Sequence, residues 1–289
     1  MTLDMRWLGT ACVQMMLPGD IHIVLDPYMD DSDNSPINSG QVERCDYIFL
    51  THGHFDHVLD VGRLVERFSC PIYCNEDTAA ALIEHQDVNP ELIVRITVGD
   101  VIDLPGFRVD VLPGVHTSVV TEFSRITGKE FPKPEDFDDE EERLKIILQA
   151  GHGTDRYHPD YPRWREMYAG GEQLNFVFEG EDGQRIYVAG SYPDHITNEA
   201  AAASRATITL LQCMSGNKLA GIEWETAEVA LASGCRTIVP QHYDPIHPGS
   251  RQTDLAPLRK IIEEEGEMEF LEMTPGHWYT FKDGIGVPK

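Results

Sequence analysis

The sequence has few basic side chains. Lys and Arg together number 23 against 49 Asp and Glu, which gives a formal net charge of −26. A chain this acidic repels phosphate backbones and anionic lipid, and it has no Lys/Arg patch, so we expect neither nucleic acid nor membrane as a partner. A small anionic substrate stays compatible with this charge, because a bound metal ion can reverse the field inside one pocket.

Other common signals are missing as well. No apolar run approaches the length of a membrane span, and Met1 to Met16 lacks the basic start and apolar core of a signal peptide. The six cysteines are scattered, and no second pair follows Cys70 and Cys74 at zinc-ribbon spacing, so we expect reduced thiols in a cytoplasmic protein. The chain has no phosphate-cradling glycine loop and no Gly-x-Ser-x-Gly nucleophile elbow.

The pattern of apolar residues predicts an α+β protein with two halves of similar order. Short strand signals fill the first third and return after residue 174, where they alternate with helical periodicity. This order predicts two packed sheets with helices outside, in a single domain spanning residues 1–289. Residues 118–171 carry few strand signals and are expected to be an insertion, of the kind that often forms a lid or binding loop. Its acidic run, 135–142, is interpreted as the solvated start of a helix over 140–150.

One short segment carries most of the chemistry. Residues 51–57 read Thr-His-Gly-His-Phe-Asp-His and follow the strand signal of residues 47–50 directly. Residues two apart in an extended loop point the same way, so His52 and His54 can grip one ion while Asp56 and His57 project beyond it. Imidazole nitrogen and carboxylate oxygen suit zinc, and they also accept manganese or iron. The segment therefore predicts one or two divalent metal ions, with zinc favoured.

This motif resembles the signature of the metallo-β-lactamase superfamily. The opening residues Trp7 to Thr10 and Val24 to Pro27 look like the branch of ascorbate-phosphate lactonase-like and N-acyl-phosphatidylethanolamine phospholipase-like proteins. The resemblance implies a four-layer αββα sandwich and extends over nearly the whole chain except the inserted, lid-like segment. It also implies that Asp26, at the end of another strand, orients a ligand histidine from behind. Carried onto matching positions, the family pattern implies a first ion held by His52, His54 and His116 and a second held by Asp56, His57 and His242.

One position departs from the family pattern. The family usually places a metal-bridging aspartate after a glycine at a strand end, but here Gly190 is followed by Ser191. A neutral hydroxyl is a weak ligand for a divalent ion, so the second ion is in doubt. Asp194 is the predicted replacement ligand, with His195 as the alternative.

The predicted activity is hydrolysis by a metal-activated water. The ion lowers the pKa of the water and polarises the attacked group, and Asp56 orients the nucleophile and takes its proton. His195 is the predicted second catalytic residue, and Tyr192 and His247 are further candidates for a donor opposite the metal. The expected substrate is a small ester, lactone or phosphoester, although amides and thioesters are also compatible with the chemistry.

Three alternatives remain open. A diiron redox protein of the same fold would carry glutamate where His54 stands, and no length remains for a flavodoxin-like domain. A metal-binding protein with reduced or lost hydrolytic activity is favoured only by Ser191. A nuclease of the same fold is disfavoured by the net charge. The sequence leaves the oligomeric state open, with a homo-oligomer as one alternative.

Overall fold

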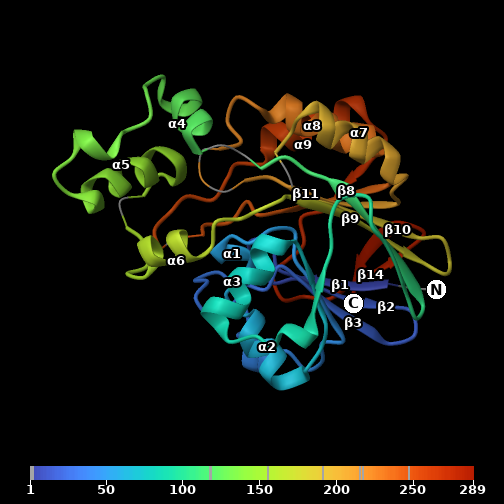
Figure 1. Ribbon diagram of the computed structural model, residues 1–289. Coiled ribbons are helices and arrows are strands. Elements are labelled where there is room, and N and C mark those ends of the chain that lie inside the picture. Colours follow the sequence, from blue (N-terminus) through green and yellow to red (C-terminus); the bar gives the residue numbers. More distant parts are fainter. Residues whose placement is uncertain are drawn as a thin grey trace.

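Two sheets form the centre of the molecule. The computed structural model describes residues 3–116, 119–154, 156–190, 192–214, 216, 218–246 and 248–289. The first sheet has eight strands in the order β15-β14-β1-β2-β3-β4-β5-β6, and the second has seven in the order β13-β12-β11-β10-β9-β8-β7. Helices cover the outer face of each sheet, so the chain forms the expected four-layer αββα sandwich (Figure 1).

The first sheet contains the motif-bearing strand. Its antiparallel part runs from β15 to β3, and β3, β4, β5 and β6 are parallel. Its strands are β1 (Leu3–Trp7), β2 (Val13–Leu17), β3 (Ile21–Leu25), β4 (Tyr47–Phe49), β5 (Ile72–Cys74), β6 (Ile93–Arg95), β14 (Tyr279–Lys282) and β15 (Ile285–Pro288). The C-terminal hairpin β14–β15, which the strand pattern did not predict, pairs with β1.

The second sheet has a parallel part and an antiparallel part. Strands β10 to β13 are parallel, and β7, β8, β9 and β10 are antiparallel. Its strands are β7 (Val101–Leu104), β8 (Phe107–Pro113), β9 (Leu174–Gly180), β10 (Arg185–Ala189), β11 (Ile208–Gln212), β12 (Thr237–Gln241) and β13 (Glu269–Phe270). Because the parallel strands are buried on both faces, they are continuous apolar runs rather than alternating ones.

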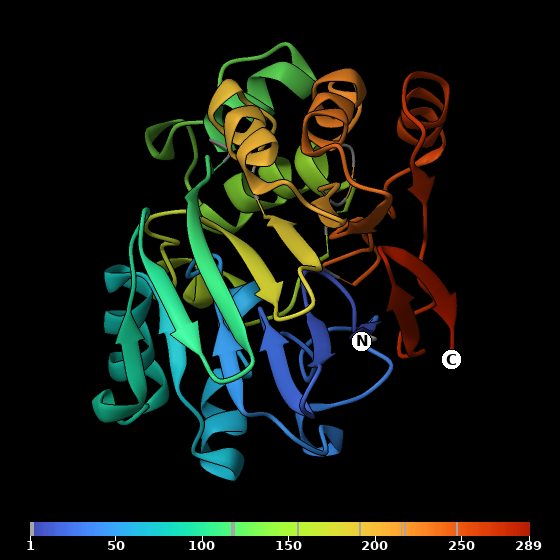
Figure 2. The same ribbon diagram turned by 90° about the vertical axis from the view of Figure 1, so that its right-hand side faces the viewer.

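Two apolar cores hold the layers together. One lies between the sheets and includes Phe49, Phe176 and Phe178, whose rings contact one another. The other lies between the first sheet and its helices, α1 (Phe55–Val58), α2 (Val61–Phe68) and α3 (Glu76–Gln86). Helices α7 (His195–Ser204), α8 (Glu223–Ser233) and α9 (Ala256–Glu265) cover the second sheet, on the opposite side of the molecule (Figures 1 and 2).

The segment predicted as an insertion runs between two paired strands. Strands β8 and β9 are antiparallel neighbours, and the chain between them forms α4 (Val119–Thr127), α5 (Glu140–His152) and α6 (Tyr161–Met167). We call residues 119–171 the helical segment. It projects beside the ends of both sheets (Figure 1). The acidic run leads into α5 as predicted: Asp139 accepts a hydrogen bond from the Glu141 N–H, and exposed glutamates fill the first turn, where the helix dipole favours negative charge.

Candidate metal centre

The Thr-His-Gly-His-Phe-Asp-His segment is placed by β4 and its neighbour β3. The chain leaves β4 and enters α1, with His54 as the N-cap residue and Phe55 as its first residue. Gly53 is held from the other side, because its N–H donates to the Gly170 carbonyl at 2.7 Å. The loop of residues 51–54 is therefore held between the central strand β4 and the end of the helical segment.

Asp26 at the end of β3 anchors the loop. Its carboxylate is fully buried and accepts hydrogen bonds from the Thr51 N–H at 2.8 Å and the Thr51 hydroxyl at 2.7 Å. The other interaction of Asp26 is with His57 Nδ1, which lies 2.9 Å from its Oδ2. Because His57 Nδ1 faces this carboxylate, His57 Nε2 is on the side of the ring toward Asp56, 4.0 Å from its Oδ2, as expected for a carboxylate that orients a ligand histidine.

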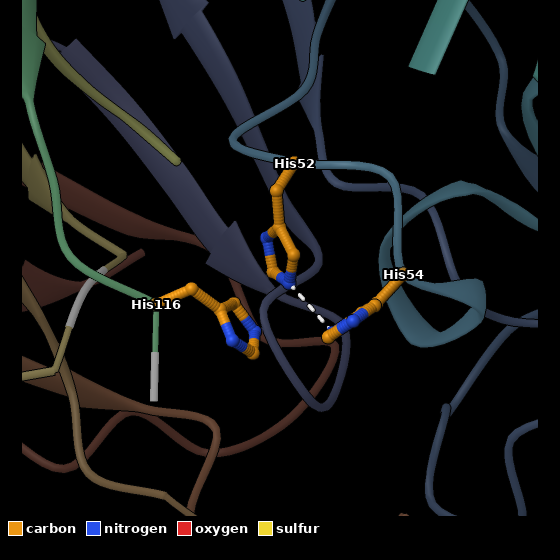
Figure 3. Close-up of side chains that lie close together, drawn as sticks. All are labelled: His52, His54 and His116. Atoms are coloured by element: carbon orange, nitrogen blue, oxygen red, sulfur yellow. Dashed lines mark hydrogen bonds between the residues drawn. The ribbon is translucent and has the colours of Figure 1, made fainter. Parts of the chain in front are cut away.

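Two groups of ligand-type side chains gather next to this loop. One consists of His52, His54 and His116, and the other of Asp56, His57 and His242. Within each group the ligand atoms lie within 4.8 Å of one another. Figure 3 shows the first group: His116 reaches the site from the loop after β8, and the three imidazoles point toward one another. These are the two sets of three residues that the family pattern implied.

The first group brings three imidazoles together, two of them neutral. His52 Nε2 lies 3.1 Å from His54 Nδ1, and the His116 ring centroid is 4.4 Å from that of His54. Burial, together with neighbouring histidines, lowers the pKa of His54 to about 3 and that of His52 well below its usual range. Both imidazoles are therefore neutral near pH 7 and offer lone pairs to a cation.

The second group joins a carboxylate to two imidazoles. Asp56 Oδ2 lies 3.2 Å from His242 Nε2 and 4.0 Å from His57 Nε2. Burial acts to raise the pKa of Asp56, but His57 and His242 outweigh it and hold that pKa well below its usual range. At His57 burial is outweighed by Asp26 and Asp56, and its pKa is raised. Asp56 is therefore an ionised acceptor at neutral pH.

His242 reaches this group from the second sheet, in a rare backbone conformation. It follows β12 directly with φ of +58°, and its N–H donates to the Thr10 carbonyl at 2.8 Å. The Thr10 N–H in turn donates to Asp244 at 2.9 Å. Non-glycine residues with positive φ persist only where surrounding contacts hold them, and they cluster at functional sites.

The donor set fits a divalent cation. His242 Nδ1 is buried without a hydrogen-bond partner among the described residues, and a buried unpaired nitrogen is costly unless an ion or water satisfies it. His52 Nε2 and His54 Nδ1 face each other on two neutral imidazoles, so at least one nitrogen lone pair is directed into the cluster. Nitrogen and carboxylate ligands of this kind are typical of zinc sites.

The two clusters lie at one end of a cavity of about 350 Å³. Its remaining lining comes largely from the helical segment and from the loop after β11. Several of these residues were not singled out in the sequence: Glu122, Arg165, Gln212 and Lys218. Glu122 is buried and its carboxylate lies 3.6 Å from Lys218 Nζ, and no sequence spacing links these two positions.

The other predicted site residues lie elsewhere or are not described. Asp194 is the N-cap of α7, where its side chain accepts from the Ile196 N–H and lies 2.8 Å from His195 Nδ1. His195 is 77% exposed, and neither residue belongs to the ligand groups or lines the cavity. Tyr192 is half-buried outside the cavity lining. Ser191 and His247 fall outside the described residues.

Comparison with known proteins agrees with this geometry. The metallo-beta-lactamase superfamily profile matches residues 10–170. The chain belongs to the metallo-beta-lactamase superfamily. The narrower resemblance to lactonase-like and phospholipase-like proteins stays a prediction.

Relatives and solved structures extend the match beyond the profile. A metal-dependent hydrolase of Rubrobacter xylanophilus is 24% identical over 93% of both chains. Another of that name, from Koribacter versatilis, is 26% identical over 43% of this chain and 52% of its own. A metallo hydrolase from the archaeon Ignicoccus hospitalis has the same fold, with a TM-score of 0.68 at 16% identity over 98% and 99% of the two chains. The prediction of a metal-dependent hydrolase is confirmed at the level of this class.

None of the helices in the described part of the chain combines the length and apolar composition needed to cross a bilayer. All six cysteines are buried and unpaired by disulfides, with Cys45 and Cys70 sulfurs 3.7 Å apart.

Proposed function

We propose that this protein hydrolyses a small ester, lactone or phosphoester in the cavity beside the two ligand groups. The observation that carries the proposal is that both three-residue clusters line one cavity of substrate size. A surface group of histidines would have no such cavity, and a purely structural metal site would have no room for a substrate. Open coordination next to a substrate-sized cavity is the arrangement expected of a catalytic site.

We assign the ligands of a first ion to His52, His54 and His116 and those of a second ion to Asp56, His57 and His242. Zinc is favoured, and manganese or iron would accept the same donors. When bound, a divalent ion supplies Lewis-acid polarisation of the substrate and activation of water near neutral pH. Asp26 and Thr51 hold the protein side of this site, through the buried hydrogen bonds described above.

Asp56 is the proposed catalytic carboxylate. It is ionised because His57 and His242 outweigh its burial, and its remaining oxygen lone pairs can accept a hydrogen bond from the attacking water. A water held in this way loses its rotational freedom before attack, which lowers the entropic part of the barrier. Asp56 thus orients the nucleophile and accepts the proton that the water releases.

Gln212 is the proposed donor to the substrate oxygen. It lies at the carboxyl end of β11, beside Gln241 of β12, and its side chain lines the cavity. Its amide oxygen is an acceptor and is buried without a hydrogen-bond partner among the described residues. The NH₂ at the other end of the same amide is the proposed donor, and a donor that faces developing negative charge stabilises a transition state strongly inside a cavity. This role replaces the one that the sequence suggested for Tyr192, His195 or His247.

A metal-binding protein with weak hydrolytic activity is the second candidate. Ser191 favours it, because the sequence lacks the carboxylate that usually bridges two ions in this superfamily. Asp194, the predicted replacement, is already occupied as the cap of α7. The two candidates differ in turnover, not in metal binding.

A substrate panel tests the proposal. The purified protein would be assayed with a p-nitrophenyl ester, an aliphatic lactone and bis-p-nitrophenyl phosphate, after chelation and after zinc or manganese is restored. We expect hydrolysis of at least one class, lost on chelation and regained with metal. Asp56→Asn should lower kcat by about 100-fold or more, a typical loss for a removed acid–base group. Bound metal without turnover of any class would support the second candidate instead.

A further inference from the structure

The cavity beside the metal ligands has two chemically different parts. It is lined by the imidazoles and Asp56 and by a second set of residues, which we call its walls and most of which are apolar. The apolar wall residues include Phe55, Phe123, Ile147, Leu148, Tyr161 and Tyr168. Apart from Phe55, Met214 and Ile246, the large apolar wall residues belong to the helical segment, which therefore supplies most of the apolar wall.

These walls are packed in place without a ligand. Phe55 meets Tyr161 edge-on with ring centroids 5.3 Å apart and stacks on Trp164 at 5.5 Å. Leu148 and Tyr168 are part of the core that joins the helical segment to α1, α2 and α3. Side chains fixed in this way cost little entropy when a ligand binds, so the apolar surface is preorganised.

The charged side chains of the walls leave the apolar part intact. Glu122 and Lys218 lie 3.6 Å apart and neutralise one another. The Arg165 guanidinium lies over the Tyr161 ring, 5.9 Å from its centroid. Polar substrate groups that face the apolar wall residues would be left unpaired, at a cost of about 1–3 kcal/mol each.

We propose that the substrate is a carboxylic ester or lactone whose acyl part is a hydrocarbon chain, held by the helical segment while its carbonyl lies at the metal ligands. This inference rests on the proposed hydrolase function and narrows its substrate class. In the reaction, the acyl carbon–oxygen bond breaks, the water oxygen joins the acyl carbon, and its proton goes to the leaving alkoxide oxygen. An ester gives a carboxylic acid with an apolar chain and an alcohol, and a lactone gives the corresponding hydroxy acid.

A series of p-nitrophenyl esters tests the inference by activity. From acetate through butyrate, hexanoate and octanoate, kcat/KM should rise by up to about fourfold for each added CH₂ until the cavity is full. Equal kcat/KM across the series, or a fall from acetate onward, would overturn the inference and leave the hydrolase proposal standing.

Two neighbouring isoleucines on α5 provide a matched pair of variants. Ile147 lines the cavity and is 6% exposed, whereas Ile146 is 37% exposed and does not line it. Ile147→Trp should fill the cavity, so that the ratio of kcat/KM on octanoate to kcat/KM on acetate falls at least tenfold relative to the parent. Ile146→Trp should behave like the parent, and equal behaviour of the two variants would count against the inference. A cooperative thermal unfolding transition in each variant would show that it is folded.

Calorimetric binding of fatty acids provides a readout that needs no turnover. Octanoate should bind the metal-free protein at least tenfold more tightly than butyrate, and Ile147→Trp should remove the difference. Chain-length-dependent binding with no ester hydrolysis would support a cavity that holds an acyl chain and would overturn the proposed hydrolase function. Ester hydrolysis without chain-length-dependent binding would support the hydrolase function and overturn the proposed acyl-chain substrate.

Discussion

Replacing Asp26 with asparagine should weaken metal binding without changing any metal ligand. The carboxylate of Asp26 accepts from the Thr51 N–H, from the Thr51 hydroxyl and from His57 Nδ1. An amide of the same shape keeps one acceptor oxygen but presents an NH₂ group where a second acceptor stood. If that NH₂ donates to His57 Nδ1, the His57 proton moves to Nε2, the nitrogen that faces Asp56.

The size of the effect follows from the hydrogen bond that the substitution removes. A hydrogen bond to a charged group contributes about 1.5–3 kcal/mol. Loss of a residue that orients a metal ligand costs roughly 10–100-fold in metal affinity, which corresponds to about 1.4–2.8 kcal/mol. The expected losses in stability and in metal affinity are of similar size, and both arise from one interaction: the contact between Asp26 and His57 stabilises the fold and fixes the imidazole. We therefore expect Asp26→Asn to lose about 1.5–3 kcal/mol in unfolding free energy and roughly 10–100-fold in affinity for an ion at the second site.

Asp60→Asn is the matched control. Asp60 is also fully buried and accepts from the Met29 N–H and from Arg63, neither of which is a ligand histidine. Urea unfolding of the metal-free proteins should show a loss of stability in both variants. Competition with a chromogenic chelator should show weaker metal binding in Asp26→Asn alone. Unchanged metal affinity in Asp26→Asn, or an equal loss in both variants, would refute the orienting role.

Further predictions concern the glycine next to the first ligand group, protons and metal. Gly170→Ala should lower metal content, because φ at Gly170 is +93° and a Cβ there would stand 2.9 Å from His54 Nε2. Gly183→Ala is the control, because φ there is +77° and nothing lies within 4 Å of the new Cβ. It should lower only the unfolding free energy, by about 1 kcal/mol. The metal-free protein should lose stability as the pH falls below about 6.5. Burial lowers the pKa of His52 and of His54, so only the unfolded chain takes up a proton at each of them. The unfolding free energy should therefore fall by roughly 1.4 kcal/mol per pH unit for each of the two histidines. The raised pKa of His57 acts in the opposite sense only above that pH, so urea unfolding at pH 5 and 6.5 measures the two lowered groups with little contribution from His57. Metal at about 100 times its Kd should raise the unfolding free energy by about 2.7 kcal/mol, seen as a higher Tm, and an unchanged Tm would contradict specific binding.

Local patterns predicted much of the fold. The strand signal of residues 47–50 corresponds to β4, and α5 begins at the predicted Glu140. The period of apolar residues and the acidic first turn are properties of a few neighbouring residues, so the sequence displays them directly. The hairpin β14–β15 was missed because its strands alternate exposed and buried positions over only four residues each, and pairing with β1 stabilises them.

The candidate site was predicted where the proposed ligands are close in sequence or match a known pattern. His116 and His242 follow two different strands, and only the resemblance singled them out. The Glu122–Lys218 pair and Gln212 could not be found in this way, because their proximity depends on how the helical segment packs over the cavity. Asp194 was expected near the ligands from its place after Gly190, but its side chain caps α7.

Metal content per chain, measured by elemental analysis of the parent and of Ser191→Asp, decides whether these clusters bind metal at all. We predict at least one equivalent of zinc or manganese in the parent, held at His52, His54 and His116, and two equivalents in Ser191→Asp, because the added carboxylate supplies the usual bridging charge. No bound metal in either protein, even after zinc and manganese are supplied, would contradict the assignment of a metal-dependent hydrolase.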